Sequence, residues 1–135
     1  MTFVIISDKI YMVVMALFKG KKVYEKEMDL LREQYKQWKL GKQEKKDPFF
    51  IIYNDFKDLY LKEISGGALK LYIFMGFHAR NWTGELWIST PKFAEFFEKD
   101  PRTIKKWLAE LEEIGLIKRI QTGYHRVANT FLLPY

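Results

Sequence analysis

Apolar and polar residues alternate along residues 101–114 with the period of an α-helix. The apolar positions recur at steps of three and four residues and therefore share one face: Ile104, Trp107, Leu108, Leu111 and Ile114. The opposite face is basic in its first turns and acidic toward its end. The pattern predicts an amphipathic helix that packs on a core and presents positive charge at its N-terminal half.

Start signals predict that this helix follows another short one. Ser89 or Thr90 can cap a helix that has Pro91 in its first turn, and Asp100 can cap a second helix that opens with Pro101. The two starts are about ten residues apart, which leaves room only for a short helix and a turn. The stretch therefore predicts a helix-turn-helix.

The residues around this motif predict a small antiparallel sheet. Gly115 is suited to end the second helix, and Leu116–Ile120 then alternates apolar and basic side chains. Residues 121–124 form a turn, and Val127–Leu133 returns as a second strand. Glu85–Ser89 is a third, short strand before the first helix. We expect the hairpin to form a wing beside the helices.

The segment before the motif predicts the core of the domain. Residues 68–80 are apolar nearly all round, as in a buried central helix on which His78 is packed, and Gly76 indicates close approach by a neighbour. Ser65, Gly66 and Gly67 separate it from a shorter helix that follows the extended residues 49–53. Four residues of that helix share a face: Phe56, Leu59, Tyr60 and Ile64.

Three tryptophans are expected at the core or its edge: Trp82, Trp87 and Trp107. For Trp82, which lies in the turn of residues 81–84, stacking on single-stranded bases is a second interpretation.

A second amphipathic helix is predicted between Lys22 and Leu40. Its stripe has a heptad-like spacing: Tyr24, Met28, Leu31, Tyr35 and Trp38. The stripe either packs on the same chain, against the core or the N-terminal strands, or pairs with a second subunit. Gly41 is expected to stop this helix, and residues 41–48 read as a linker. We therefore expect an N-terminal extension, residues 1–48, and a second domain, residues 49–135.

The first twenty residues are strongly apolar. They lack a basic leading region and a small-residue cleavage site, and Asp8 and Lys9 interrupt the run, so a signal peptide is not expected. The uninterrupted part, Ile10–Phe18, is too short to cross a bilayer. Residues 3–6 and 10–18 are interpreted as strands, or the second run as the start of a buried helix.

Composition narrows the function classes. The chain has 135 residues, 48% of them apolar, which suits one packed domain with an extension. It has no cysteine and two distant histidines, which argues against disulfides, metal sites and cofactors, and favours a reducing, cytoplasmic setting. The net charge of +6 favours a polyanionic partner. The excess charge lies in residues 19–46 and 101–135.

Candidate DNA contacts lie on the second helix of the motif and on the wing. Lysine and arginine in the first turns of such a helix neutralise phosphates or reach guanine acceptors, and wing residues add affinity for the backbone. Because neighbours on a strand point to opposite faces, at most one of Lys118 and Arg119 is expected on the DNA face. The full set is Thr90, Lys92, Arg102, Thr103, Lys105, Lys106, Lys118, Arg119, Thr122, His125 and Arg126.

The second half of the chain also resembles a known family. FFIIYNDFKDLYLKEISGGALKLYIFM, GELWIST, DPRTIKKWLAELEEIGLIKRI and RVANTFLLPY are similar to the winged-helix domains of Gram-positive plasmid and phage maintenance proteins. These include replication initiators and TubR-like centromere-binding partition proteins. The resemblance covers residues 49–135 and implies a mainly α fold with a small antiparallel β-wing. It also implies double-stranded DNA binding by a homodimer, at repeated or palindromic sites.

Three hypotheses follow for function. The first is a non-enzymatic, sequence-specific DNA-binding protein: a repressor, a partition adaptor that binds a further protein, or a replication initiator. The second is a winged-helix module that binds another protein, against which the basic surface argues. The third is an enzyme, for which the sequence shows no phosphate-binding glycine loop, metal-ligand cluster or activated nucleophile.

Overall fold

The computed structural model describes Met12 and residues 20–135, and the chain divides after Pro48 into two compact units. The strands or helix expected within residues 1–18 lie outside the described residues, Met12 excepted. Each unit is described by itself.

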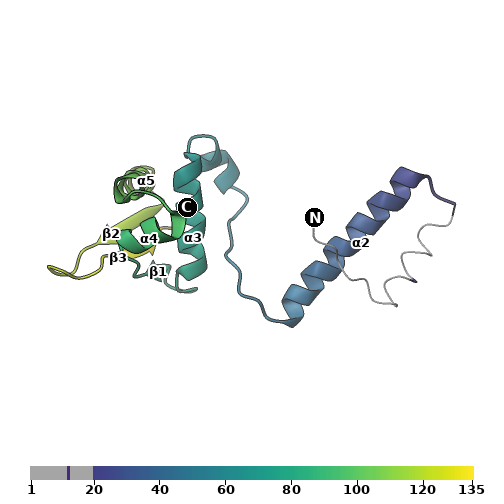
Figure 1. Ribbon diagram of the computed structural model, residues 1–135, viewed down its shortest axis with the longest axis horizontal. Helices are drawn as coiled ribbons and strands as arrows, with labels where there is room; N and C mark the ends of the chain where they lie inside the picture. Colours follow the sequence, from purple (N-terminus) through teal and green to yellow (C-terminus); the bar gives the residue numbers. More distant parts are fainter. Residues whose placement is uncertain (1–11, 13–19) are drawn as a thin grey trace. The chain divides into compact units, whose positions relative to one another are not determined.

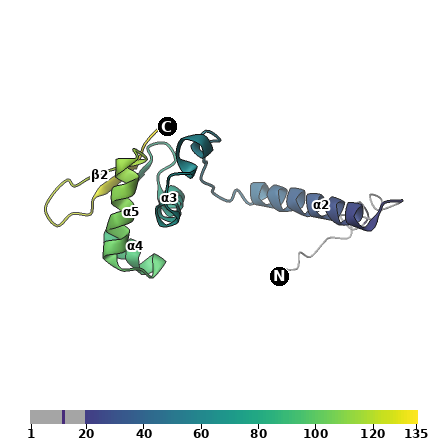
Figure 2. The same cartoon turned by 90° about the horizontal axis from the view of Figure 1, so that it is seen from above.

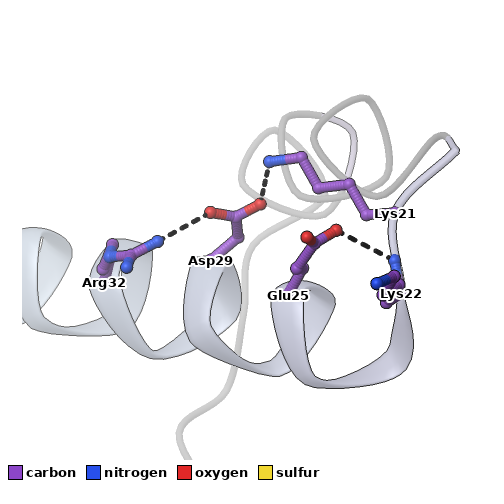
Figure 3. Close-up of polar contacts among 5 residues, drawn as sticks. All are labelled: Lys21, Lys22, Glu25, Asp29 and Arg32. Atoms are coloured by element: carbon purple, nitrogen blue, oxygen red, sulfur yellow. Dashed lines mark hydrogen bonds and ion pairs between the residues drawn. The ribbon is translucent and has the colours of Figure 1, made fainter.

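Among the described residues of the first unit, Val23–Glu44 form one long helix, α2 (Figure 1). Before its first residue, the backbone N–H of Lys22 donates a hydrogen bond to the Glu25 carboxylate at 3.0 Å. The Asp29 carboxylate is paired with Lys21 and, at 3.1 Å, with Arg32 (Figure 3). The start of α2 is therefore held by acidic side chains in its first two turns, where the helix dipole favours them.

The expectation that Gly41 stops this helix is wrong, because α2 continues for three more residues, to Glu44. A single glycine costs a helix only about 1 kcal/mol relative to alanine, so good helix formers on both sides can carry it. The left-handed residue that ends α2 is Lys46, with φ 52°. There the backbone N–H of Asp47 donates to the carbonyl oxygen of Lys42 at 3.1 Å, which closes the last turn.

The second unit contains four helices and three short strands (Figures 1 and 2). Residues 49–53 have no regular secondary structure, and a short π-helix, η1, follows them. In chain order the elements are η1 Lys57–Leu61, α3 Gly66–His78, β1 Glu85–Leu86, α4 Thr90–Phe97, α5 Pro101–Glu113, β2 Ile117–Ile120 and β3 Asn129–Leu132.

The three-stranded antiparallel sheet expected from the sequence is confirmed, with strand order β1-β3-β2. Its strands are shorter than predicted. In the register, Lys118 lies opposite Phe131 and Arg119 opposite Thr130, so Lys118 and Arg119 point to opposite faces. Leu86 on β1 also lies opposite Thr130, and both are buried on the face that meets the helices.

The central position predicted for α3 is confirmed, since it provides four buried residues: Ala68, Leu71, Tyr72 and Met75. They pack with buried residues of α4, α5 and the sheet in one core. Two glycines allow α3 to be approached closely. A side chain at Gly76 would overlap the ring of Phe50, and one at Gly67 would overlap the indole of Trp107. The close neighbour expected at Gly76 is therefore Phe50.

Several residues expected in the core are exposed. Leu59 points away from the face that Phe56 and Ile64 bury, because the π-helical turn changes the angle between successive side chains. His78 lies at the exposed end of α3, where its ring contacts Phe74 with centroids 4.5 Å apart. Trp82 is 94% exposed in the turn before β1. Phe77 and Trp87 are also exposed. Of the three tryptophans expected at the core or its edge, only Trp107 packs against the core.

Candidate nucleic-acid interface

The turn between α4 and α5 is built from local capping interactions. Ser89 precedes α4 but makes no side-chain capping bond, and Pro91 lies in the first turn. Glu98 adopts the left-handed conformation, with φ 53°, and ends α4. The Asp100 side chain then accepts a hydrogen bond from the backbone N–H of Arg102 at 2.8 Å. This last bond confirms the predicted cap of α5 and fixes where that helix starts.

The end of α5 is closed by Gly115, whose φ is 83°. Its backbone N–H donates to the carbonyl oxygen of Glu112 at 3.1 Å, and that of Leu116 donates to the carbonyl oxygen of Leu111 at 3.0 Å. These two bonds form the glycine-dependent termination motif predicted from the sequence. Because Leu116 is buried immediately after it, the chain passes from α5 directly into β2.

The inner face of α5 is buried through Ile104, Leu108 and Leu111. Glu110, which the sequence pattern places outward, is instead turned to the start of α3. Its carboxylate accepts hydrogen bonds from both the backbone N–H and the hydroxyl of Ser65, each at 2.9 Å. This acidic side chain therefore joins α5 to α3, a contact between residues 45 positions apart that helical periodicity does not reveal.

The outer face of α5 is basic at its N-terminal end. Arg102, Lys105 and Lys106 are exposed, and Thr103 is half-buried beside them. On α4, Lys92 is exposed in the first turn and Thr90 is half-buried. Within the described residues, none of these lysine and arginine side chains takes part in an ion pair. The cationic groups are therefore available to an anionic partner.

One exposed basic residue near these side chains was not among the DNA contacts predicted from the sequence. Lys99 is exposed in the turn between α4 and α5, directly before the capping residue Asp100. The signal that could have identified Lys99 as a contact is its place in the turn of the motif, because the turn and the start of the second helix lie on the same side of the motif.

Arg119 is tied to α4 and to β3. Its Nε donates to the Thr130 hydroxyl at 3.2 Å, and its Nη1 donates to the Thr90 hydroxyl at 3.4 Å. Burial lowers the pKa of this guanidinium, and the nearby Glu112 acts in the opposite direction. Lys118 is exposed on the other face of the sheet. The structure thus brings Arg119 and Thr90 together and leaves Lys118 apart from them.

The loop of residues 121–128 extends beyond the helical part of the unit (Figures 1 and 2). It is closed by the Gln121 side chain, which donates to the carbonyl oxygens of Gly123 and Arg126. His125 has a positive φ of 64°, and Tyr124 beside it is almost fully exposed. Thr122, His125 and Arg126 are all exposed on this loop.

Within residues 20–135, no helix has both the length and the apolar character that a membrane span requires. Nor does that part of the chain hold a group of three or more His, Cys, Asp or Glu side chains placed to bind a metal ion.

Residues 62–117, which run from the end of η1 to the first residue of β2, match the family model of a helix-turn-helix domain. This segment contains β1, α4 and α5, and together with β2 and β3, which complete the antiparallel sheet, it forms a winged helix-turn-helix fold. The mainly α fold class with a β-wing predicted from the sequence is confirmed.

Two solved structures are similar to the chain. One is described as the N-terminal domain of a DNA binding protein; it is 18% identical, the match covers 69% of this chain and 79% of that one, and the TM-score is 0.45. The other is described as a Rep-DNA complex; it is 17% identical, with 70% and 81% of the two chains covered and a TM-score of 0.45. No curated protein matches the chain.

Proposed function

We propose that this protein binds double-stranded DNA sequence-specifically, without enzymatic activity, and places α5 in the major groove. The observation that carries the proposal is the exposed basic start of α5, with Arg102, Lys105 and Lys106 on a helix held at both ends by caps. A helix of this kind in a helix-turn-helix reads base edges with its N-terminal residues.

The remaining candidate residues suit contacts with the sugar-phosphate backbone. Thr90, Lys92 and Lys99 lie at the start of α4 and in the turn, where the first helix of such a motif crosses the backbone. The exposed residues of the wing loop extend the same kind of contact to flanking DNA. Backbone contacts set the register and affinity, whereas side chains of α5 determine the sequence.

Such binding serves a partition adaptor, a replication initiator or a transcriptional repressor, and in each of these roles two copies act together at repeated or palindromic sites. The position of the bound site relative to the protein's own gene and to a replication origin distinguishes these roles.

The test is selection of bound duplexes from a random library, followed by titration of the selected site at several salt concentrations. We expect affinity to fall steeply with salt, because each phosphate contact releases counterions. Lys106→Ala is expected to weaken binding by about 1–3 kcal/mol if the side chain reads a base, and to relax sequence preference there. Lys57→Ala, on the exposed surface of η1, is the matched control.

Binding to no duplex at low salt would contradict the proposal. Equal losses of affinity for the Lys106 and Lys57 variants would argue against α5 as the reading helix.

A further inference from the structure

The stripe on α2 is exposed along its whole length. Its five large side chains are between 45% and 62% exposed, and the helix has no fully buried residue. In order they are Tyr24, Met28, Leu31, Tyr35 and Trp38. Tyr35 and Trp38 contact each other, with ring centroids 5.4 Å apart, and so form a continuous aromatic surface. A row of this size on an otherwise charged helix indicates a partner.

We propose that the partner is the α2 helix of a second copy of this chain, packed antiparallel on the same stripe. Spacings of four and three residues are those at which two helices bury a common seam. In an antiparallel pair centred between Leu31 and Tyr35, Leu31 faces Tyr35 of the second copy, and Met28 faces Trp38. In each of these two layers a large side chain is opposed by a smaller one, and two-fold symmetry repeats both layers.

The charges beside the stripe favour this orientation. One flank carries Glu25 at its N-terminal end and Lys39 at its C-terminal end, while Lys42 continues the line of the stripe itself. Antiparallel packing places Glu25 beside Lys39 of the second copy at both ends of the pair. A parallel pair would instead place Lys42 beside Lys42, in line with the stripe. At its two ends the antiparallel arrangement therefore gives opposite charges, whereas the parallel one gives like charges at Lys42.

The centre of the proposed pair brings the two Arg32 side chains near each other. Arg32 already donates to the Asp29 carboxylate at 3.1 Å, as Figure 3 shows. Hydrogen bonds from Lys21 and Arg32 favour the charged form of that carboxyl and lower its pKa. Because Asp29 is also paired with Lys21, its single negative charge offsets only part of the positive charge that Arg32 brings to the centre of the pair.

The pair should be weak in solution, because the stripe covers little more than two heptads. Two copies on neighbouring half-sites would raise the local concentration of α2, so the same contact would become strong on DNA without new interactions. This consequence rests on the proposed function, whereas the pairing itself does not.

The first experiment measures molecular mass by sedimentation over a range of concentrations. We expect the wild-type chain to shift from monomer to dimer, and Leu31→Lys with Tyr35→Lys to stay monomeric. Leu40→Lys is the control, since Leu40 is also exposed but lies on the opposite side of the helix. All three substitutions put a good helix former on an exposed site, and circular dichroism checks that α2 is retained. A wild type that stays monomeric throughout, or a stripe variant that dimerises equally well, would overturn the proposal.

The second experiment determines orientation, and the absence of native cysteine makes it direct. Met28→Cys and Trp38→Cys chains are oxidised separately and as a mixture. Antiparallel packing predicts disulfide dimers chiefly in the mixture. Efficient cross-linking of each variant with itself, and no gain on mixing, would overturn the antiparallel arrangement.

DNA binding separates this inference from the proposed function. The stripe variant is expected to bind a single half-site like wild type but to lose cooperativity on the paired site. Dimers that bind no duplex would contradict the proposed function and leave the pairing in place. If the wild-type chain stays monomeric and binds DNA without cooperativity, the pairing is contradicted and the proposed function stands.

Discussion

The indole ring of Trp107 lies directly over Gly67, so that the second residue of α3 meets the middle of α5 without an intervening side chain. Glu110, one turn further along α5, accepts two hydrogen bonds from Ser65, which caps α3. These two contacts hold the start of the central helix against the helix proposed to enter DNA. The orientation of α5 in the unit therefore depends on α3.

Replacing Gly67 tests this contact. Gly67→Ala is expected to lower the free energy of unfolding by about 1–3 kcal/mol, because the new methyl group overlaps the Trp107 ring. Gly66→Ala is the matched control, since a methyl group there meets no neighbouring atom. Both changes lie at the start of the same helix, so thermal or denaturant unfolding separates the packing effect from helix propensity. Equal stabilities of the two variants would contradict the close approach.

The two capping positions of the motif should differ in importance. Asp100→Ala is expected to destabilise the protein by about 1 kcal/mol, because the backbone N–H of Arg102 loses its acceptor. Ser89→Ala should have a much smaller effect, since the Ser89 side chain makes no capping bond. Denaturant unfolding of both variants measures the difference. A Ser89 variant as unstable as the Asp100 variant would show that the caps are equivalent.

Neighbouring basic residues on β2 should contribute unequally to DNA binding. Arg119 reaches Thr90 at the start of α4, whereas Lys118 faces the other side of the sheet. Arg119→Ala should therefore weaken duplex binding and make its salt dependence shallower, by a slope of about 0.9 for each phosphate that is no longer neutralised. Lys118→Ala should change neither quantity. The measurement is affinity at several salt concentrations, and a larger effect of Lys118→Ala would assign the opposite face of the sheet to DNA.

Acid should weaken the last turn of α2. A hydrogen bond from Lys42, 2.7 Å long, lowers the pKa of the Asp47 carboxyl below its ordinary value of 3.8. The charged carboxylate therefore favours the folded form above the unfolded pKa, and this support is lost as the pH falls through the folded pKa. Asp47→Asn should reduce helicity at neutral pH and converge with wild type near pH 2, about two units below the ordinary value. If circular dichroism shows the same difference in helicity between the variant and the wild type at both pH values, the pairing of Asp47 with Lys42 is contradicted.

The helix-turn-helix was predictable because its signals are local. Asp100 and Gly115 act on backbone groups within a few residues, and the apolar spacing of α5 depends only on helical geometry. The same reasoning failed at Gly41, where a local signal for helix termination was outweighed by the helix formers around it, and Lys46 took the left-handed conformation instead.

Burial at the ends of elements could not be predicted in the same way. His78 and Trp82 carry ring side chains that were expected at the core. However, α3 ends and the chain turns before any other element covers them. Whether a side chain is covered depends on what packs over it, and that information is non-local.

By itself, the sequence determined where the two helices of the motif start, where the second one ends and the period of its apolar face, because these depend on residues close together in the chain. The excess of positive charge follows from composition alone. Only the tertiary structure decided that Glu110 turns toward Ser65, that Arg119 joins β2 to Thr90, and that Phe50 packs against Gly76. Those contacts join distant positions, and their partners become apparent only once the core has brought the elements together.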